Sequence, residues 1–442
     1  MLKPSERSRI GLLLAVTGLL TLIGCGSSSG SADQGTGGGG PPGGASGGGV
    51  AAVGGASSGG ASVAGSANSI AGSASVAGTA SSGGSAGGAS GGTGGGGSSG
   101  GSASGGNAGS AGAMGNGGAT SCMTPPAPSA LVGWAAVNGM GTPTTTGGGD
   151  ATPQIVTTLD AFKAAVAGDT PAVVYLNAKL EPSSIAVGSN KTIVGICGAE
   201  IHGHLGISKA SNVIVRNVKI VGYAVGDCTK DPSFDAAVGC SSGADAVSIT
   251  GASHHVWFDH TDISDGTDGN LDTNAGSDFI TISWTKFHYT PRTDNVGNDS
   301  TGAGGHRFSN LVGSADDVPG DVGHLNMTWH HDWWAENVNQ RMPRTRHGKI
   351  HVVNNLYSSS GNSYCTNSGN LASLLVENNI YSGVKNPLQP DANGDMLARN
   401  NVFMNTSGTT TANGTGFTPP YSYTPEATGA LAAAIMSGAG PH

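Results

Sequence analysis

The sequence has little charge, and most of that charge is acidic. Charged residues make up only 11% of the 442 residues, and 19 Lys plus Arg face 28 Asp plus Glu, for a formal net charge of −9. Removing residues 1–121 takes away three basic and two acidic side chains, so the remainder carries −10. A globally acidic chain opposes binding to nucleic acid, and we expect no nucleic-acid partner. A polyanion could bind only through a local basic cleft or a bound cation.

The chain also lacks a long apolar run. Its most hydrophobic stretch, residues 10–23, follows a basic region and is too short to span a bilayer comfortably. The stretch ends in Leu-Ile-Gly-Cys at residues 22–25, which resembles a bacterial lipobox. We predict a lipoprotein signal peptide over residues 1–24, a lipid on Cys25 and an extracellular or cell-surface location on a bacterial outer membrane. An ordinary secretory signal with an incidental cysteine is the alternative.

Side chains that could build a core are almost absent from residues 26–121. This segment is nearly all Gly, Ser and Ala, and Asp33 is its only ionisable residue. Such a composition buries too little apolar surface to offset the entropy of ordering. We predict a disordered linker over residues 25–125 and one sizeable domain over residues 126–442. The lipid anchor would then be the only membrane contact, with the domain held away from the bilayer.

Cysteines are few, and none stands in a CxxC metal-binding spacing. If Cys25 is lipidated, five cysteines remain in an oxidising compartment and one must stay unpaired. Cys228 and Cys240 bracket a short polar loop, so we predict that they form a disulfide. Cys197 follows the apolar run of residues 192–196, and we expect it to be a buried free thiol.

Short β-branched runs recur along the domain and predict its fold. Their last residues are separated by 43, 24, 47, 24, 24 and 22 positions, and the two long steps are either double steps or contain long loops. A step of 22–24 residues is typical of an all-β parallel solenoid whose coils share one core, although a β-sandwich with frequent turns is an alternative. Paired asparagines fit a repeated turn at which stacked side chains hydrogen-bond along the axis, at residues 354–355, 378–379 and 400–401.

Two short helices are predicted at the ends of the solenoid. Thr157-Thr158 precedes an amphipathic pattern over residues 159–166, which indicates an N-terminal capping helix over the first coil. Pro425 precedes a second helical pattern over residues 426–436, near the other end, which Gly438 would terminate.

Three acidic residues suggest a cation site. Asp268 and Asp272 are four apart and would share a strand face, and Asp245 lies 23 residues before Asp268, so one solenoid step would stack it on Asp268. Grouped carboxylates repel one another unless they are protonated or neutralised, and Ca²⁺ is the natural partner for such oxygen ligands. The alternative is that these three acidic residues are solvated turn residues, which would explain the same spacing.

Three arginines cluster in the segment of residues 341–346. Arg341, Arg344 and Arg346 flank Pro343, which favours a strand end or edge. Guanidinium groups there can form paired hydrogen bonds to the carboxylates of a bound polymer. We expect Arg344 to satisfy structural partners, and Arg341 and Arg346 to be functional.

These segments resemble the pectate lyase family. The resemblance covers roughly residues 130–405 and implies a right-handed, single-stranded parallel β-helix. The motifs that carry it are Trp257-Phe258-Asp259-His260, Asp268-Gly269-x-x-Asp272, Ser277-Asp278-Phe279-Ile280-Thr281-Ile282-Ser283 and Arg341-x-Pro343-Arg344-x-Arg346-x-Gly348.

The resemblance implies Ca²⁺-dependent β-elimination of polygalacturonate. It assigns calcium binding to Asp245, Asp268 and Asp272. It also assigns abstraction of the C5 proton to Arg341 and substrate binding to Arg346. The base role rests on the resemblance alone, because a guanidinium does not normally lose its proton. We expect a monomer that binds polygalacturonate or pectin.

One position departs from the family pattern. The family usually has a substrate-binding Lys before a Leu-x-Gly-x-x-Asp stretch, which is residues 311–316 here, and direct register places Phe308 at that position. Arg307 or Arg292 could take the place of the Lys. Pectin lyases, which act on methyl esters, have an Arg there but lack the calcium carboxylates. The carboxylates therefore favour pectate, with a pectin lyase or a non-catalytic polysaccharide-binding β-helix as alternatives.

Two further groups of residues could be mistaken for functional ones. Asp259 and His260 would suit an acid–base pair, but a packed turn of the solenoid is the preferred interpretation. Trp329, Trp333 and Trp334 could stack on sugar rings, yet packing in the core or in loops is expected.

Overall fold

The computed structural model describes residues 122–292 and 306–442. The predicted signal peptide, Cys25 and the linker as far as residue 121 lie outside the described residues and remain predictions. Residues 293–305, which include a Gly-rich insertion over residues 294–305, also lie outside the described residues.

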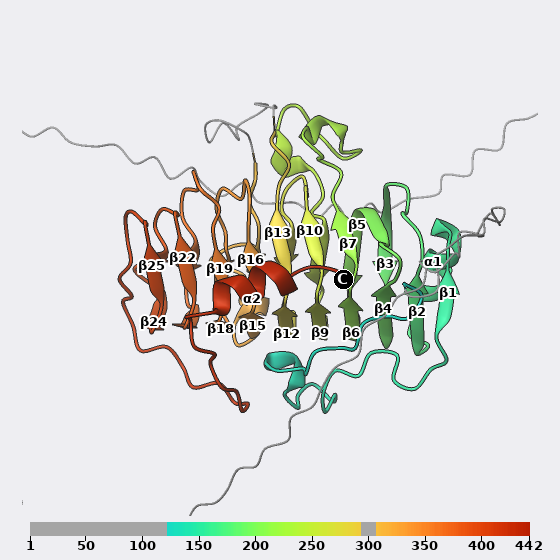
Figure 1. The fold of residues 1–442 in the computed structure, drawn as a ribbon, viewed down its shortest axis with the longest axis horizontal. Helices are drawn as coiled ribbons and strands as arrows, with labels where there is room; N and C mark the ends of the chain where they lie inside the picture. Colours follow the sequence, from blue (N-terminus) through green and yellow to red (C-terminus); the bar gives the residue numbers. More distant parts are fainter. Residues whose placement is uncertain (1–121, 293–305) are drawn as a thin grey trace, which may run out of the picture. The chain divides into compact units, whose positions relative to one another are not determined.

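Short strands wind around one axis, and every pairing between named strands in the described residues is parallel (Figure 1). They form three faces. The first face contains β1 (Gln154–Val156), β2 (Ala172–Leu176), β4 (Lys191–Gly195), β6 (Ser211–Arg216), β9 (His254–Asp259), β12 (Asp278–Ser283), β15 (Met327–His330), β18 (Lys349–Val353), β21 (Ser373–Glu377) and β24 (Asp395–Arg399).

The other two faces share the long strand β5 (Glu200–Ser208), which pairs with β7 through its first residues and with β8 through its last. The second face continues with β7 (Lys219–Val221), β10 (Asp262–Ser264), β13 (Lys286–His288), β16 (Trp333–Trp334), β19 (Leu356–Tyr357), β22 (Ile380–Ser382) and β25 (Val402–Met404). The third contains β3 (Ser183–Val187), β8 (Val247–Thr250), β11 (Leu271–Thr273), β14 (Leu311–Val312), β17 (Arg344–Thr345), β20 (Thr366–Ser368) and β23 (Leu388–Pro390). The predicted parallel β-helix is confirmed, and the β-sandwich alternative was wrong.

The interior is built from side chains stacked in register on successive coils. Because side chains alternate along a strand, every second residue of the first face points inward and meets its equivalent in the next coil. One such row is fully buried and consists of Val256, Ile280, Met327, Ile350, Leu374 and Met396.

Asparagines form the predicted ladder at the turn after the first face. Asn355 Nδ2 donates to Asn379 Oδ1 at 2.9 Å, and Asn379 Nδ2 donates to Asn401 Oδ1 at 3.0 Å. The residue before each of these adopts a left-handed backbone, with φ of 56°, 52° and 55° at residues 354, 378 and 400. Asparagine tolerates this conformation better than other non-glycine residues, which explains why it comes in pairs.

The two long sequence steps are single coils with long loops. Lys219 and Asp262 pair directly, as do Ile280 and Met327, so no coil is missing between them. The β7–β8 loop contains the 3₁₀ turns η2 (Cys228–Lys230) and η3 (Cys240–Ser242), and the β14–β15 loop contains η4 (Pro319–Asp321). The β7–β8 loop rises above the strands at the top of Figure 1.

Helix α1 (Leu159–Val166) begins as predicted. The Thr158 hydroxyl accepts the N–H of Ala161 at 3.3 Å, and Phe162 and Val166 are buried in the core. Figure 1 shows α1 beside β1 and β2 at one end of the solenoid.

Helix α2 (Leu431–Gly438) differs from the prediction in start and position. It does not begin at Glu426, because the backbone of that residue binds the side chain of Asn354 through N–H and C=O, both at 2.8 Å. It lies along the second face rather than over an end, with Leu431 and Ile435 packed on Leu356 and Ile380.

The cysteines pair as two disulfides. Cys228 and Cys240 are bonded as predicted, with Cα atoms 5.5 Å apart. The expectation for Cys197 was wrong, because it is bonded to Cys122 with Cα atoms 4.7 Å apart, and the buried free thiol among the described residues is Cys365. Cys122 falls within the predicted linker, so its partner could not be inferred from strand patterns.

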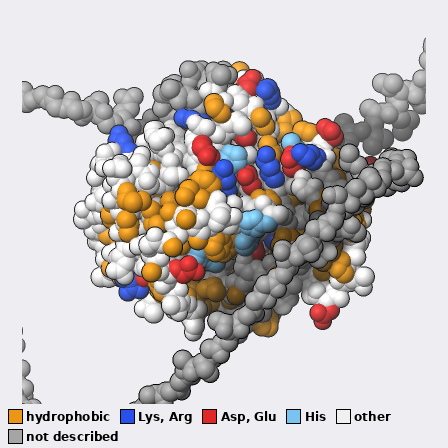
Figure 2. Space-filling model, viewed as in Figure 1, with side chains coloured by type: hydrophobic (Ala, Val, Ile, Leu, Met, Phe, Trp, Pro, Cys, Tyr) orange, Lys and Arg blue, Asp and Glu red, His pale blue; other side chains and the backbone are white. Residues whose placement is uncertain are grey.

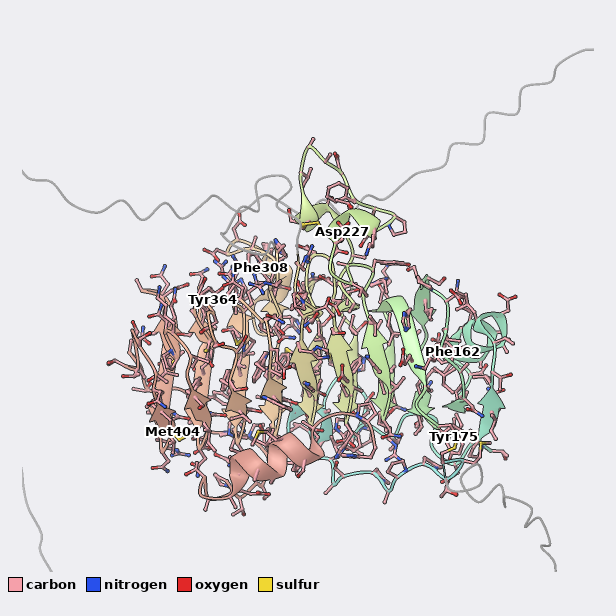
Figure 3. All side chains as sticks on the ribbon, turned by 45° about the horizontal axis from the view of Figure 1, so that its top comes forward. Phe162, Tyr175, Asp227, Phe308, Tyr364 and Met404 are labelled. Carbon is pink, nitrogen blue, oxygen red and sulfur yellow. A yellow bond between two sulfur atoms is a disulfide. The ribbon has the colours of Figure 1, made fainter. Side chains whose placement is uncertain are left out.

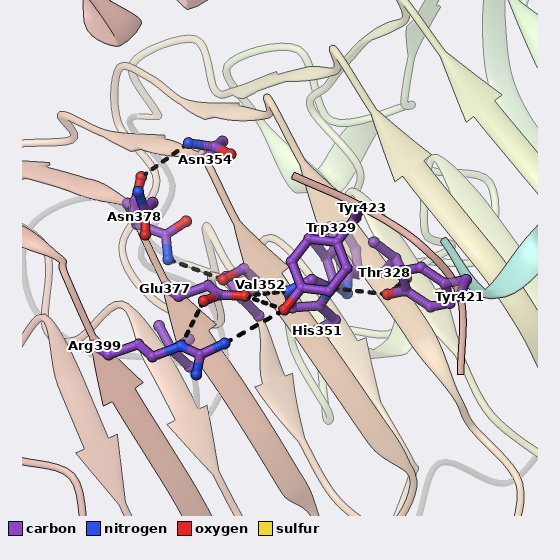
Figure 4. Close-up of polar contacts among 12 residues, drawn as sticks. Thr328, Trp329, His351, Val352, Asn354, Glu377, Asn378, Arg399, Tyr421 and Tyr423 are labelled. Atoms are coloured by element: carbon purple, nitrogen blue, oxygen red, sulfur yellow. Dashed lines mark hydrogen bonds and ion pairs between the residues drawn. The ribbon is translucent and has the colours of Figure 1, made fainter. Parts of the chain in front are cut away.

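A buried polar network fastens the C-terminal segment to the first face (Figure 4). Glu377 accepts hydrogen bonds from Tyr423 Oη at 2.5 Å and from Arg399 Nε at 2.6 Å, and it lies 3.0 Å from His351 Nε2. Tyr421 Oη lies 2.8 Å from the other nitrogen of His351. Burial would raise the pKa of Glu377, but these hydrogen bonds outweigh it and lower the pKa to about 2.

The outer surface of the second face is mixed in character. Figure 2 shows charged and histidine side chains gathered over β10 and β13 and apolar side chains around α2. The charged side chains are paired with one another, for example His288 with Asp262 at 2.8 Å and Lys286 with Glu336 at 3.4 Å. Among the described residues, no helix has the length and hydrophobicity to cross a bilayer.

Candidate active site

Three carboxylates meet on the third face. Asp245 precedes β8, Asp268 lies in the turn before β11, and Asp272 is within β11. Gly269 lies against two of them, since a Cβ placed there would be 2.8 Å from Asp272 Oδ1 and 3.0 Å from Asp245 Oδ1. Only glycine leaves room for both oxygens.

The expected stacking of Asp245 on Asp268 was wrong by one residue. Val247 pairs with Leu271, a step of 24 rather than 23, and the N–H of Ala246 donates to Gly269 C=O at 2.9 Å. Gly269 is therefore the neighbour of Asp245 in the next coil. Asp268 reaches the same pocket from the turn, where its Oδ1 lies 3.0 Å from His306 Nε2.

Burial makes two of these carboxyl groups weaker acids than usual. Burial, followed by the nearby charges of Asp272 and Asp268, raises the pKa of Asp245 well above its ordinary value. Burial also raises the pKa of Asp272 to about 7, although Arg341 and the N–H of Leu311, which donates to Oδ1 at 2.8 Å, oppose the rise. Asp245 Oδ1 is buried without a hydrogen-bond partner among the described residues. Asp245 and Asp272 therefore have too few neutralising partners for both to be ionised without strong repulsion.

Arg341 faces the same pocket from the connection between β16 and β17. Its backbone is left-handed, with φ of 62°, and its guanidinium carbon lies 4.5 Å from the centroid of the Phe308 ring. Its Nε is buried with no hydrogen-bond partner in the part of the chain that the structure describes. Its charge acts on both Asp245 and Asp272. The structure therefore brings Arg341 together with the three predicted metal ligands.

Arg346 is engaged within the protein. Its Nε donates to Asp316 Oδ1 at 2.7 Å, and one terminal nitrogen donates to the carbonyls of Gly313 and Ser314 at 2.9 and 3.3 Å. Arg344 shows the opposite pattern, because no side-chain hydrogen bond or ion pair joins it to the described residues. The structural partners that we expected for Arg344 are therefore absent among the described residues, whereas Arg346 has such partners.

The candidates for the family's lysine lie close to the site. Arg292 is buried and donates to His306 C=O at 2.8 Å and to Cys240 Sγ at 3.2 Å, so it holds loops together. Phe308 is buried and pairs with Gln340 in the next coil, and Arg307 is adjacent to it. Arg307 is half-buried, and its carbonyl accepts the N–H of Asn339 at 2.8 Å.

Two residues near the site were missed by sequence reasoning. His306 follows the Gly-rich insertion and packs on Phe308, with ring centroids 3.8 Å apart. Tyr364 lies in the connection between β19 and β20, and its hydroxyl is within electrostatic range of Arg341, Arg344 and Arg346. Figure 3 labels Phe308 and Tyr364 close to each other on the rim of the solenoid. Only the coil register, which no local motif specifies, reveals them.

The other candidate residues have packing roles. Asp259 accepts hydrogen bonds from Ser129 Oγ at 2.7 Å and from Ser283 Oγ at 2.9 Å, and it pairs with His260 at 3.0 Å. Trp329 and Trp334 are fully buried in the core, and Trp333 packs against the cluster under α2. These findings agree with the structural interpretation.

No group of three His, Cys, Asp or Glu side chains within residues 122–292 and 306–442 converges closely enough to define a metal centre.

Comparison with known proteins identifies the family. A model of the pectate lyase family matches residues 110–442, which is most of the chain. The chain belongs to the pectate lyase family. This lyase is 31% identical over 325 residues to a pectate trisaccharide-lyase of Bacillus licheniformis, covering 68% of this chain and 83% of the relative. It is 30% identical over 323 residues to pectate lyase A of Aspergillus niger, covering 70% and 87%.

Solved structures share the fold of this lyase. A pectate lyase from a Bacillus species, crystallised in complex with trigalacturonate, aligns with a TM-score of 0.56 and 24% identity. The alignment covers 71% of this chain and 99% of that one.

Proposed function

We propose that this pectate lyase cleaves (1,4)-α-D-galacturonan by Ca²⁺-dependent β-elimination and releases 4,5-unsaturated products. One observation carries the proposal. Asp272, which is buried, and Asp245, whose Oδ1 is buried, both have raised pKa values and share a pocket with the guanidinium of Arg341. The likeness to lyases named for pectate supports the choice of substrate.

The carboxylates fit a hard divalent cation. Asp245 has a buried oxygen without a partner, and the charges on Asp268 and Asp272 act on its carboxyl group, so a cation would relieve a repulsion already present. Asp245, Asp268 and Asp272 would hold the ion. When bound, Ca²⁺ withdraws charge from a substrate carboxylate and stabilises the carbanion formed beside it.

Arg341 is the proposed base. In its neutral form it takes the proton from C5 of the uronate. The electron pair left at C5 becomes the C4–C5 double bond as the C4–O bond breaks, and the departing oxygen takes a proton from solvent. The ring of Phe308, 4.5 Å away, and the turn containing residue 341 hold the side chain toward the pocket.

Arg307 and Arg346 are the proposed substrate-binding cations. For Arg346, a substrate carboxylate would share or replace the contact with Asp316, which is exposed over 67% of its side chain. Arg307 stands next to the position at which the family has a lysine.

The test is an assay for unsaturated product by ultraviolet absorbance, on polygalacturonate with Ca²⁺ and with a chelator. The proposal requires product with Ca²⁺ and its loss with the chelator. Product only from methyl-esterified substrate would favour a pectin lyase, an alternative supported by the apolar Phe308 beside the site. No product under either condition would favour a non-catalytic polysaccharide-binding β-helix.

We also propose that the chain is a bacterial cell-surface lipoprotein acylated at Cys25. The sequence of residues 22–25 supports this location. Replacing Cys25 with Ser in the full-length chain should move the protein from the membrane fraction to the soluble fraction. If the protein stays membrane-bound, the anchor is elsewhere.

A further inference from the structure

The side chain of Arg344 makes no polar contact with the described residues that would give it a structural role. Its side chain is half-buried on β17, and no hydrogen bond or ion pair joins it to the described residues, whereas Arg346, two positions later, makes contacts with a carboxylate and two carbonyls. Ordering a long side chain costs entropy, and leaving a half-buried guanidinium unpaired adds a desolvation cost. A cation held in this way fits a binding role better than a packing role.

The register places Arg344 on the row that begins at the candidate metal ligands. Thr273 pairs with Val312, and Leu311 pairs with Arg344, which pairs in turn with Asn367. Neighbouring strands are ~4.8 Å apart, so Arg344 lies two coils, or roughly 10 Å, along the axis from the backbone of Asp272. A polymer lying along the axis would pass Asp272 and then, two coils further on, the coil that carries both Arg341 and Arg344.

Tyr364 lies beside this row in the next connection. The N–H of Ser309 donates to Gln340 C=O at 3.0 Å, and the N–H of Ser363 donates to Asn339 C=O at 2.7 Å. The connections that carry Phe308, Arg341 and Tyr364 therefore stack on one another in three successive coils. Figure 3 labels Phe308 and Tyr364 on the rim. Tyr364 is half-buried.

The charges around Tyr364 favour an anion. Burial raises the pKa of Tyr364, and the charges of Arg341, Arg344 and Arg346 oppose the rise. Two carboxylates stand nearby. Asp316 is paired with Arg346 at 2.7 Å, and Asp391 accepts a hydrogen bond from Asn367 Nδ2 at 3.0 Å. Arg341 faces the carboxylates of the candidate metal site and Arg346 is paired with Asp316, so Arg344 is the guanidinium of the three that is left without a carboxylate partner among the described residues.

We propose that Arg344 and Tyr364 form a further subsite that binds the free carboxylate of a galacturonate unit next to the one that reacts. This inference rests on the proposed function and extends it to substrate specificity. The Arg344 guanidinium can donate two parallel hydrogen bonds to a carboxylate, and the Tyr364 hydroxyl can donate a third. A methyl ester carries no negative charge, so the subsite selects unesterified pectate.

The first experiment measures kinetics on polygalacturonate and on highly methyl-esterified pectin. Arg344→Gln is expected to raise KM for polygalacturonate about tenfold with kcat changed less than about twofold, the size expected for losing a charge-assisted hydrogen bond. Arg344→Lys should recover part of the loss, and Tyr364→Phe should raise KM about threefold. The same variants should leave KM for the esterified polymer unchanged.

The control is Lys179→Gln, which removes the same charge from a side chain that is 71% exposed on an early coil. Thermal unfolding of each variant separates binding from stability, because a packing role would lower the melting temperature and change KM for both substrates. Tyr364→Phe removes one oxygen and keeps the ring, so it remains informative if Arg344→Gln is unstable.

The second experiment measures binding without turnover. Calorimetric titration of trigalacturonate with Ca²⁺ compares Arg341→Ala with the double variant Arg341→Ala/Arg344→Gln. Weaker binding by the double variant supports the subsite even if the wild-type protein shows no lyase activity. Equal binding by the two, or wild-type turnover with unchanged KM in Arg344→Gln, would overturn the subsite while the proposed function stands. Absence of both turnover and binding would overturn both proposals.

Discussion

The guanidinium of Arg341 lies 4.5 Å from the centroid of the Phe308 ring. The two residues come from adjacent coils, so the contact depends on the solenoid register and not on local sequence. A buried aromatic face attracts a cation and restricts its rotamers, at a net gain of about 0.5–2 kcal/mol. The contact therefore positions the proposed base and places an apolar surface where the family pattern has a lysine.

Replacing Phe308 with Leu should lower kcat about two- to fivefold, because the aromatic face that fixes Arg341 is lost while most of the buried volume remains. Steady-state kinetics on polygalacturonate provide the measurement. Phe403→Leu, at an exposed position on the last coil, is the matched control. Unchanged kcat in Phe308→Leu would mean that the turn of residue 341 holds the arginine unaided.

Replacing Arg341 with Ala should reduce kcat about 10²- to 10⁴-fold, the usual contribution of a general base, with little change in stability. The side chain is half-buried and makes no hydrogen bond or ion pair with the described residues, so the fold should survive. Circular dichroism and thermal unfolding serve as controls. Turnover at the wild-type rate would show that another group removes the proton.

Removing divalent cations should destabilise the protein more at neutral pH than at acid pH. Burial raises the pKa of Asp272 to about 7 from its ordinary value of 3.8, so the folded state retains a proton that the unfolded chain releases. That stability is fully present below pH 4 and is lost as the pH rises through 7. The melting temperature of chelator-treated protein should therefore fall across this window.

Added Ca²⁺ should reverse the fall, contributing about 2.7 kcal/mol at one hundred times its Kd. Asp272→Asn should remove both the pH dependence and most of the response to Ca²⁺, with Asp150→Asn, at an exposed position, as control. A melting temperature that does not respond to Ca²⁺ at pH 7.5 would contradict the proposed cation site.

Replacing Asp332 with Asn should stabilise the protein by about 1–3 kcal/mol at neutral pH. Asp332 occupies a ladder position, where Oδ1 accepts the N–H of Thr285 at 2.9 Å and the N–H of Asp332 donates to Asn355 Oδ1 at 2.8 Å. Its Oδ2 is buried without a partner in the described residues, whereas the Nδ2 of Asn355 donates to the carbonyl of Trp329 at 3.0 Å.

An amide at residue 332 could make the equivalent bond to the carbonyl of Ile282, the register partner of Trp329. Burial raises the pKa of Asp332. The stability that comes from its protonated form is therefore fully present below pH 4 and is lost as the pH rises toward the raised pKa, so the gain from Asn should grow with pH. Chemical denaturation from pH 4 to pH 9 would measure it. A gain that does not depend on pH would mean that the pKa of Asp332 is not raised in the folded protein.

Replacing Glu377 with Gln should cost about 2–3 kcal/mol near pH 7, because three partners lose a charged acceptor. The pKa of Glu377 is lowered to about 2 from 4.5, so its contribution is present above pH 4.5 and lost as pH falls toward 2. The difference between wild type and variant should shrink over that range in denaturation experiments. Glu181→Gln, at an exposed site, is the control, and a difference that stays constant down to pH 2 would contradict the lowered pKa.

Local rules made the fold predictable. The asparagine ladder, the Thr158 cap and the Cys228–Cys240 bond each depend on residues within one turn or on a constant repeat, and sequence reasoning found all three. The start of α2 was missed because Asn354, 72 residues upstream, binds the backbone of Glu426.

The site was harder to predict because it depends on the exact register. A step of 24 instead of 23 places Gly269, not Asp268, beside Asp245, and sequence spacing cannot distinguish the two. The partners of Arg346 within the protein were missed for a related reason. The partner of Arg346, Asp316, lies 30 residues earlier and becomes a neighbour only when two coils stack.

The Cys122–Cys197 bond has a mechanical consequence. Any tension on the chain before residue 122 enters the solenoid through sulfur at Cys197, just beyond β4, and so bypasses α1, β1 and β2. Terminal coils of a solenoid are the easiest to peel, since each has only one neighbour. A load applied to the chain before residue 122 is transmitted through the Cys122–Cys197 disulfide to an inner coil, so the first coil does not carry it.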